Sequence, residues 1–272
     1  MHEESAHFKP FKGIAPYLGG KSRLAKTIAA EIEKIPHQQY AEPFVGMGGM
    51  FFRRLTPAHY EVVNDINKEI SNLYRILQRH YPAFVDYTTW MICSRDTFAK
   101  LKAANPESLT DLERAARFYY LQKICFGGRS ASPTFPAHHF NPSRFNINRL
   151  TLELEQINQR LSGVVIECMD FGDFIARYDG ANTLFYLDPP YYHHENDYGS
   201  GVFRRADFTR LASILSGITG KFILSLNDVP EVRQIFSAFG IRAVTTTYTT
   251  NGAHQKEVGE VLISNQWQKK SF

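Results

Sequence analysis

A short run from Leu184 to Tyr191 carries the residues best suited to chemistry. Four apolar residues, typical of a buried strand, lead directly into Asp188, two prolines and Tyr191. Because proline has a fixed φ and no N–H, the pair should end the strand and hold the Pro189 carbonyl beside the Asp188 carboxylate. In open α/β sheets, ligands bind at the carboxyl ends of strands. The run therefore predicts a rigid pair of hydrogen-bond acceptors beside an aromatic ring.

Two rigid acceptors suit an aromatic amine such as adenine N6, whose lone pair is delocalised into the ring. If the Asp188 carboxylate and the Pro189 carbonyl each accept one N–H, the nitrogen becomes more tetrahedral and can attack an electrophilic methyl group. Pro190 completes the turn, and Tyr191 would stack on the base. The alternative is an ordinary Pro-Pro loop after a core strand. A methyl-donor site elsewhere in the chain would decide between the two.

A glycine-rich turn indicates where such a donor would bind. Residues 40–49 read as a short strand, the turn Gly46-Met47-Gly48-Gly49 and a helix start, which is typical of nucleotide-binding sheets. The spacing is G-x-G-G, so a dinucleotide pyrophosphate is not specifically indicated. The glycines would still let a ligand approach the backbone closely.

Two further predicted strands end in acids. Residues 60–65 end in Asp65, a carboxylate placed to bind the ribose hydroxyls of a nucleoside or to cap the following helix. Residues 164–168 end near Asp170 and Phe171, which would hydrogen-bond the amine of an adenine ring and pack on its face. Together with the glycine turn, these acids predict a nucleoside site beside the acceptor pair.

The alternation of strand and helix patterns predicts an α/β sheet interrupted by one insertion. Strand signals vanish between residues 81 and 161. We therefore predict a catalytic domain made of residues 1–80 and 162–272 and an inserted, mostly helical domain at 81–161. Asn251-Gly252 separates the last two strand patterns, so the sheet should end in a C-terminal β-hairpin.

The inserted segment is basic, which favours a polyanionic partner. From residue 90 to residue 150 there are nine lysines and arginines against four acidic residues, although the whole chain has a net charge of only +4. A capping box at residues 110–113 opens a helix that should run to about Ile124, and residues 126–150 are irregular in pattern. Cations with interleaved aromatic rings are typical of nucleic-acid binding. The alternative is a chance run on a solvated face.

Cysteine usage and hydropathy exclude other classes. Cys93, Cys125 and Cys168 are odd in number and widely spaced, so we expect reduced thiols in a cytoplasmic protein. His193 and His194 lack further ligands at metal spacing, so we expect no metal. The first ten residues contain no apolar stretch, and no apolar run reaches membrane-spanning length, so we expect no membrane segment.

Six motifs stand in one order: PYLGGKSRL at 16–24, EPFVGMGG at 42–49, NDIN at 64–67, DF at 170–171, DPPY at 188–191 and EVLISN at 260–265. In this set and order the chain resembles the Dam-like (D12 class, alpha-group) DNA adenine-N6 methyltransferases. The resemblance implies S-adenosylmethionine as methyl donor, a Rossmann-like sheet of seven strands, and flipping of the target adenine out of double-stranded DNA. The insert would then be the target-recognition domain. We expect a monomer in solution, with more than one copy able to bind a DNA molecule.

Carried over by position, the resemblance assigns roles to individual residues. The catalytic set is Asp188, Pro189, Pro190 and Tyr191. The cofactor-binding set is Tyr17, Lys21, Phe44, Gly46, Gly48, Asp65, Ile66, Asp170, Phe171 and Asp188. The DNA-binding candidates, all in the basic segment, are Lys123, Arg129, Ser130, Arg144, Asn146 and Arg149.

The chain departs from the family in its first motif and in its recognition segment. Enzymes of this family that read GATC usually have a lysine where Pro16 stands, and an R-x-N-x-x-G-x-F-N pattern that is absent between Phe126 and Leu150. A target other than GATC is therefore expected.

Three rival functions remain open from the sequence. An RNA adenine-N6 or protein glutamine methyltransferase more often has asparagine at the position of Asp188. An NAD(P)-dependent oxidoreductase would fit the first two strands but leaves the acceptor pair and the basic insert unexplained. A nucleic-acid binder without catalysis would have no need of both a donor and an acceptor motif.

Overall fold

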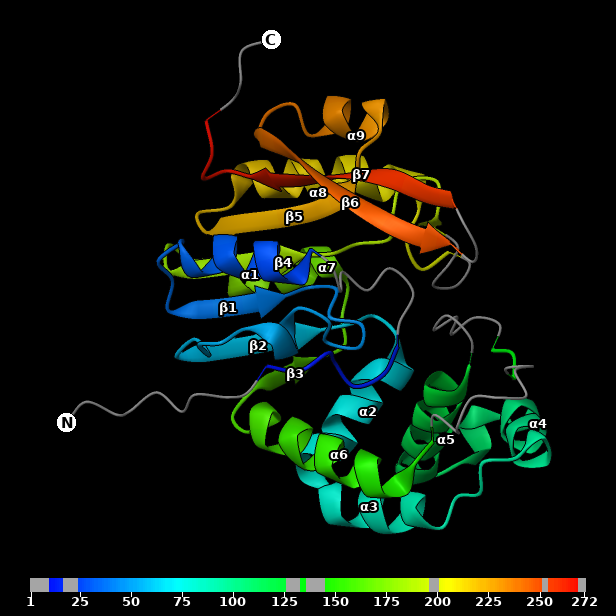
Figure 1. The fold of residues 1–272 in the computed structure, drawn as a ribbon. Helices are drawn as coiled ribbons and strands as arrows, with labels where there is room; N and C mark the ends of the chain where they lie inside the picture. The colour runs from blue at the N-terminus through cyan, green and yellow to red at the C-terminus, as the bar shows by residue number, and fades with distance from the viewer. Residues whose placement is uncertain are drawn as a thin grey trace.

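The computed structural model describes residues 10–16, 24–125, 133–135, 145–195, 201–250 and 254–268. Within them, a seven-stranded sheet has the order β3-β2-β1-β4-β5-β7-β6 (Figure 1). Its strands are β1 (Gln39–Glu42), β2 (Tyr60–Asn64), β3 (Val165–Glu167), β4 (Thr183–Leu187), β5 (Lys221–Asn227), β6 (Gly240–Thr250) and β7 (His254–Ser264). The first five are parallel, whereas β7 runs antiparallel to both β5 and β6. The predicted α/β sheet with a C-terminal antiparallel pair is confirmed.

Strand β4 lies in the middle of the sheet and is covered on both faces. All five of its residues are buried, because helices cover both faces of the sheet. Phe185 and Leu187 pack on one side, with helices α7 (Phe171–Tyr178), α8 (Arg205–Gly217) and α9 (Pro230–Ile235). Leu184 and Tyr186 pack on the other side, with α1 (Ala25–Glu33) and the 3-10 turn η1 (Phe51–Arg53). Both faces of β4 are thus covered by other parts of the protein, and only its carboxyl end can contact a ligand.

The predicted helical insert lies past β3, at one edge of the sheet (Figure 1). Its elements are α3 (Tyr81–Thr89), α4 (Arg95–Ala103), η2 (Pro106–Ser108), α5 (Asp111–Ile124) and α6 (Ile147–Leu161). Helix α2 (Lys68–Arg79) precedes the insert and packs against α5 and α6. The capping box of α5 is present: Glu113 N donates to the Thr110 hydroxyl at 3.3 Å, and Thr110 N donates to the Glu113 carboxylate at 2.9 Å. Helix α5 ends at Ile124, as predicted.

Two helix starts differ from the sequence prediction. Helix α6 begins at Ile147, inside the segment predicted to be irregular, because the Asn146 side chain caps it by accepting from Arg149 N at 3.3 Å. Helix α2 is capped by Asn67, which accepts from Glu69 N at 3.0 Å, and not by Asp65. In both cases the side chain of one asparagine caps the first turn and so sets where the helix begins. The composition of the surrounding segment obscured this signal.

A buried ion cluster joins the insert to the sheet. The Glu61 carboxylate on β2 accepts from Arg54 Nη1 at 2.5 Å, from Arg160 Nη2 on α6 at 2.9 Å, and also from Arg160 Nη1. Both guanidinium groups are almost fully buried and lie over aromatic rings, Arg54 over Tyr40 and Arg160 over Phe51. This cluster fixes α6 against the first two strands.

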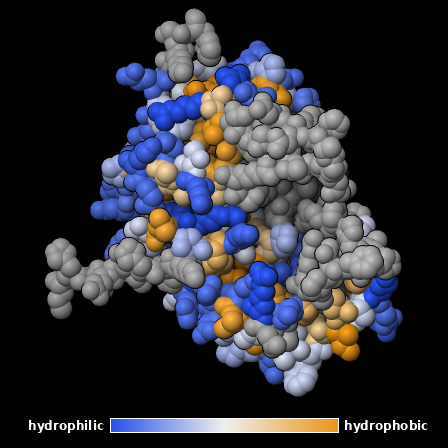
Figure 2. Space-filling view, in the orientation of Figure 1, coloured by the Kyte–Doolittle hydropathy of each residue, from blue (hydrophilic) through white to orange (hydrophobic). Residues whose placement is uncertain are grey.

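The part of the surface seen in Figure 2 is mostly hydrophilic, with apolar residues in small separate groups. In the ranges that the structure describes, no helix has the length and apolar character needed to cross a membrane. Within the same ranges, no group of three or more His, Cys, Asp or Glu residues could hold a metal ion.

Candidate active site

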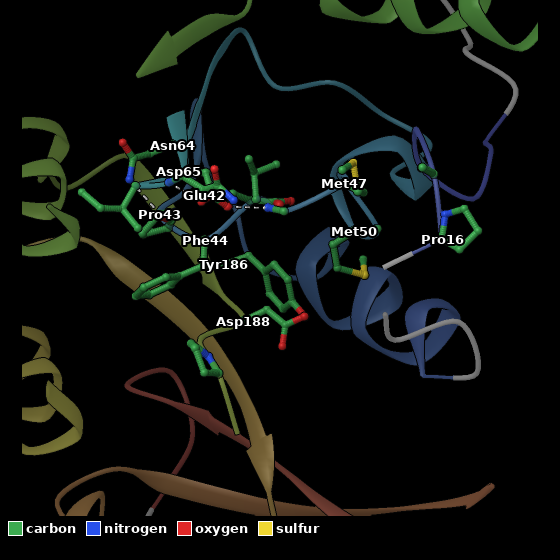
Figure 3. A pocket seen from close by; sticks show the side chains of 18 of the residues that line it. Pro16, Glu42, Pro43, Phe44, Met47, Met50, Asn64, Asp65, Tyr186 and Asp188 are labelled. Atoms are coloured by element: carbon green, nitrogen blue, oxygen red, sulfur yellow. Dashed lines mark hydrogen bonds between the residues drawn. The ribbon is translucent and has the colours of Figure 1, made fainter. Parts of the chain in front are cut away.

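A cavity of about 690 Å³ lies at the carboxyl ends of β1, β2 and β4. Seven of the predicted cofactor-binding residues line it: Phe44, Gly46, Asp65, Ile66, Asp170, Phe171 and Asp188. Tyr17 and Lys21 lie outside the described residues. Figure 3 shows Phe44, Tyr186 and Asp188 around the cavity, with Met47, Met50 and Pro16 on its other side. The glycine turn therefore shares one cavity with Asp188, although the two lie far apart in the sequence. We call the Asp188 carboxylate together with the Pro189 carbonyl the Asp188 notch.

Asn64, the last residue of β2, holds the loops of this cavity together. Its amide nitrogen donates to the carbonyls of Pro43 and Met169, each at 3.0 Å, and its amide oxygen accepts from Met169 N at 2.9 Å. The loop after β1 carries Phe44, and the loop after β3 carries Asp170. Because Asn64 is buried and bonded to both loops, it fixes how the cavity walls stand relative to each other. Sequence analysis missed Asn64, although it precedes Asp65 in the NDIN motif.

Asp65 ties the glycine turn to the start of α2. One carboxylate oxygen accepts from Gly46 N at 3.0 Å and the other from Asn67 N at 2.9 Å. Desolvation raises the pKa of Asp65 to about 6, although these two hydrogen bonds act to lower it. Each carboxylate oxygen can accept a further hydrogen bond, so the group can still receive hydroxyl donors from a sugar.

Asp170 and Phe171 form the opposite wall. Asp170 caps α7 by accepting from Gly172 N at 2.8 Å, and it forms a two-pronged ion pair with Arg210 of α8. That hydrogen-bonded Arg210 guanidinium lowers the pKa of Asp170, so the carboxylate is an acceptor only. Arg210 also lies over the Phe171 ring, whose centre is 5.5 Å from that of Phe44. Sequence analysis missed Arg210, which carries no local motif.

Gly48 differs from the other predicted donor residues because it does not line the cavity. Its φ is +71°, and a Cβ at this position would lie 2.3 Å from the Phe52 ring and 2.7 Å from the Tyr74 hydroxyl. The turn therefore requires glycine here for its own packing and backbone conformation. Gly49 lines the cavity in its place.

The Asp188 notch stands where the sequence analysis put it, at the end of β4. Pro189 and Pro190 are buried, whereas Asp188 is half-buried and lines the cavity. Ser225 on β5 donates to Asp188 Oδ1 at 3.2 Å. The Tyr191 hydroxyl donates to Glu260 on β7 at 2.7 Å, and Glu260 is fully buried. Residues 188–191 are thus held by hydrogen bonds to two other strands, β5 and β7.

Glu42, at the end of β1, is a buried acid that sequence analysis missed. It lines the cavity and accepts from the Tyr40 hydroxyl at 2.6 Å. Burial raises the pKa of Glu42 to about 8, and the neighbouring Asp188 also acts to raise it. Asp65, Asp170 and Asp188 line the same cavity, together with the cationic side chains of Lys12, Arg53, Lys123 and Arg149. The signal in the sequence was an acid directly before Pro43 at a strand end.

Comparison with known families identifies the reaction. A model of the D12 class N6 adenine-specific DNA methyltransferases matches residues 17–250. The chain belongs to this family. Its members transfer the methyl group of S-adenosylmethionine to N6 of adenine in DNA, so this methyltransferase has the cofactor and the reaction that its sequence motifs implied.

Individual relatives agree with this assignment. The methyltransferase is 25% identical over 234 residues to the type II methyltransferase M.CviBI of Paramecium bursaria Chlorella virus NC1A, covering 84% of this chain and 87% of the relative. It is 26% identical over 292 residues to M1.LlaDCHI of Lactococcus lactis subsp. cremoris, covering 97% and 98%. The DNA N-6-adenine-methyltransferase of Escherichia phage P1 is 27% identical over 251 residues, with 85% of this chain and 32% of the relative covered.

In the insert, two predicted DNA-binding residues of the methyltransferase line the same cavity. Lys123 is only 9% exposed and donates to Glu153 at 2.7 Å, while Arg149 donates to Glu153 at 2.9 Å. Burial lowers the pKa of Lys123, and its hydrogen bond to Glu153 opposes that shift. Asn146 caps α6. The other three candidates, Arg129, Ser130 and Arg144, lie outside the described residues.

Proposed function

We propose that the cavity binds S-adenosylmethionine and that the Asp188 notch receives an adenine flipped out of double-stranded DNA. The observation that carries this proposal is that Asp188 lines the same cavity as Gly46 and Asp65. A methyl donor bound against the glycine turn and an amine held at Asp188 would therefore lie close enough to react. The cavity is also within the usual size range of ligand sites, roughly 300–1,000 Å³.

The side chains of the cavity fit a nucleoside that carries a sulfonium group. Phe44 and Phe171 offer aromatic faces to an adenine ring, and Asp65 can accept from ribose hydroxyls. The Asp188 carboxylate would face the positive charge, whereas burial raises the pKa of the neighbouring Glu42 to about 8 and favours its neutral form. When bound there, S-adenosylmethionine would supply an electrophilic methyl group on a positively charged sulfur.

The notch would then prepare the amine. Asp188 and the Pro189 carbonyl each accept one N–H of adenine N6, which turns the nitrogen lone pair towards the methyl carbon. These acceptors would favour the positive charge that develops on N6 as the N–C bond forms and the methyl–sulfur bond of the donor breaks, with its electron pair left on sulfur. They would therefore stabilise the transition state more than the ground state. After the bond has formed, N6 releases one proton to Asp188 or to water. Tyr191 would stack on the flipped base.

We further infer that residues 81–161 form the target-recognition domain, with residues 1–80 and 162–272 as the catalytic domain. The helices of the insert lie together at one edge of the sheet, and Lys123 and Arg149 bring the insert to the wall of the cavity. A cytoplasmic enzyme accords with the free cysteines at 93, 125 and 168. We also propose that the enzyme is a monomer in solution.

The test is methyl transfer to unmethylated duplex DNA by wild-type protein and by Asp188→Ala. We expect the variant to lose transfer while its affinity for DNA changes little, because the carboxylate acts on the amine and not on the phosphates. Fluorescence of 2-aminopurine at the target position would report base flipping separately. Substantial turnover by Asp188→Ala would refute the assigned role, and mapping of modified adenines would give the target sequence.

A further inference from the structure

We propose that Ser225, itself held by Tyr186, is a positioning residue that aims the Asp188 carboxylate at the target amine. This inference rests on the proposed role of Asp188. Ser225 is fully buried on β5, next to β4 in the sheet. Its hydroxyl lies 3.2 Å from Asp188 Oδ1 and 3.0 Å from the Tyr186 hydroxyl. One buried hydroxyl therefore contacts both side chains.

The register of the sheet brings the three side chains together. Strands β4 and β5 are parallel, with Leu187 beside Leu224, so Asp188 and Ser225 follow at the same level. Tyr186 and Asp188 are two residues apart, and successive side chains of a strand alternate between its faces, so both point to the same side. Figure 3 shows the Tyr186 ring and the Asp188 carboxylate side by side at the cavity.

The available protons set the direction of the hydrogen bonds. A serine hydroxyl has one proton, and an ionised carboxylate can only accept. Ser225 donates to Asp188 at 3.2 Å, a shorter contact than that to the Leu187 carbonyl at 3.4 Å, and its oxygen can then accept from the Tyr186 hydroxyl. Tyr186 is buried, and its burial together with the nearby Asp188 raises its pKa well above 10, so it keeps its proton. The hydrogen bonds therefore run from the Tyr186 hydroxyl to Ser225 and from Ser225 to the Asp188 carboxylate.

These hydrogen bonds restrict the orientation of the Asp188 carboxylate. The two prolines after Asp188 stiffen the backbone, but they do not hold the rotation of its carboxylate. A donor on β5 does so, because it fixes the position of Oδ1 and favours the ionised form that accepts from the amine. The direction in which the carboxylate meets adenine N6 is then set by the core of the sheet and not by the loop alone.

A purely structural role predicts a different outcome. Ser225 also lies 3.4 Å from the Leu187 carbonyl, so its hydroxyl has a second acceptor. If Ser225 served only to bond the Leu187 carbonyl, removing its hydroxyl would lower the free energy of unfolding without a specific effect on kcat. A positioning role instead predicts a loss in kcat with little change in binding.

The experiment compares Ser225→Ala, Tyr186→Phe and the double variant in full-length protein. We expect Ser225→Ala to lower kcat about 10- to 100-fold, the range for losing a hydrogen bond to a charged group. Dissociation constants for S-adenosylmethionine and for duplex DNA should stay unchanged. Tyr186→Phe alone should lower kcat about 2- to 10-fold, as for a neutral hydrogen bond. The double variant should be no slower than Ser225→Ala, because Tyr186 acts through Ser225.

Two controls make the result decisive. Ser216 on α8 also donates to a backbone carbonyl but lies on an exposed helix face, so Ser216→Ala should leave kcat unchanged. If Ser225→Ala does not fold, Ser225→Cys keeps a weaker donor of similar size and should give an intermediate kcat. Unchanged kcat in a folded Ser225 variant, a loss confined to donor or DNA affinity, or additive effects in the double variant would overturn the inference. An active Asp188→Ala would instead overturn the proposed function itself.

Discussion

Asp65 and Asp188 both follow a parallel strand at its carboxyl end, yet their surroundings give them different partners. Asp65 accepts from two backbone N–H groups, which fix it beside the glycine turn. Asp188 accepts from the Ser225 hydroxyl and lines the cavity from the far side of that turn. In the function we propose, Asp65 would bind a sugar and Asp188 an amine.

The first residue-scale prediction concerns Asp65. Asp65→Ala should raise the dissociation constant of S-adenosylmethionine by about 10- to 100-fold, because charge-assisted hydrogen bonds to the ribose are lost. The target sequence should not change. Isothermal titration measures the first effect and methylation mapping the second, with the exposed Asp86→Ala on α3 as control. Normal donor affinity in a folded Asp65→Ala protein would remove Asp65 from the site.

A second prediction follows from Glu42, whose pKa is raised from 4.5 to about 8 by burial. The folded state holds this proton more tightly than the unfolded chain, so stability should fall as pH rises from about 4.5 to 8. The slope from this group is at most about 1.4 kcal/mol per pH unit. Glu42→Gln, which keeps an acceptor for the Tyr40 hydroxyl, should flatten the dependence. Denaturant titrations between pH 5 and pH 9 measure it, and equal slopes in both proteins would contradict the assignment.

At the scale of elements, hydrophobic patterns and punctuating residues predicted most of the strands and helices. Strand β4 was readable because it is buried on both faces, and α5 because its capping box is local. The start of α6 was not, because a single asparagine cap sits in a segment whose composition is typical of a loop. Gly48 was predicted to contact the cofactor. In the fold, glycine is required there because a side chain would collide with Phe52 and Tyr74.

The attachment of α6 to the sheet gives a prediction at the same scale. Glu61→Ala would leave Arg54 and Arg160 buried without their shared carboxylate, so the free energy of unfolding should fall by about 3–5 kcal/mol. Glu155→Ala, on the same helix as Arg160 but exposed, should change it by less than about 0.5 kcal/mol. Urea denaturation of both variants measures the difference. Equal losses would mean that the cluster does not hold the insert in place.

On the scale of the whole molecule, the insert and the catalytic sheet meet at one cavity. Glu153 forms ion pairs with both Lys123 and Arg149, so its carboxylate offsets part of the positive charge of the insert. Arg149 is nevertheless 81% exposed, whereas Lys123 is buried. Exposure makes Arg149 the better placed of the two to reach a phosphate.

The salt dependence of DNA binding tests this arrangement. Arg149→Ala should reduce the slope of log K against log salt concentration by about 0.9, the value for one lost phosphate contact. Arg177→Ala, on α7 at the opposite face of the sheet, should leave the slope unchanged. Binding titrations between low and moderate salt measure both. An unchanged slope for Arg149→Ala would assign Arg149 to structure or to base reading.

The sequence by itself determined the strand ends that carry Asp65, Asp170 and Asp188, the glycine turn and the order of the motifs, because these depend on neighbours along the chain. The tertiary structure alone decided which distant residues meet them. Ser225 beneath Asp188, Glu260 beneath Tyr191 and the position of β7 between β5 and β6 all depend on the order of strands in the sheet. Local patterns do not encode that order, because a strand can pair through either edge and its hydrophobicity is satisfied in both arrangements.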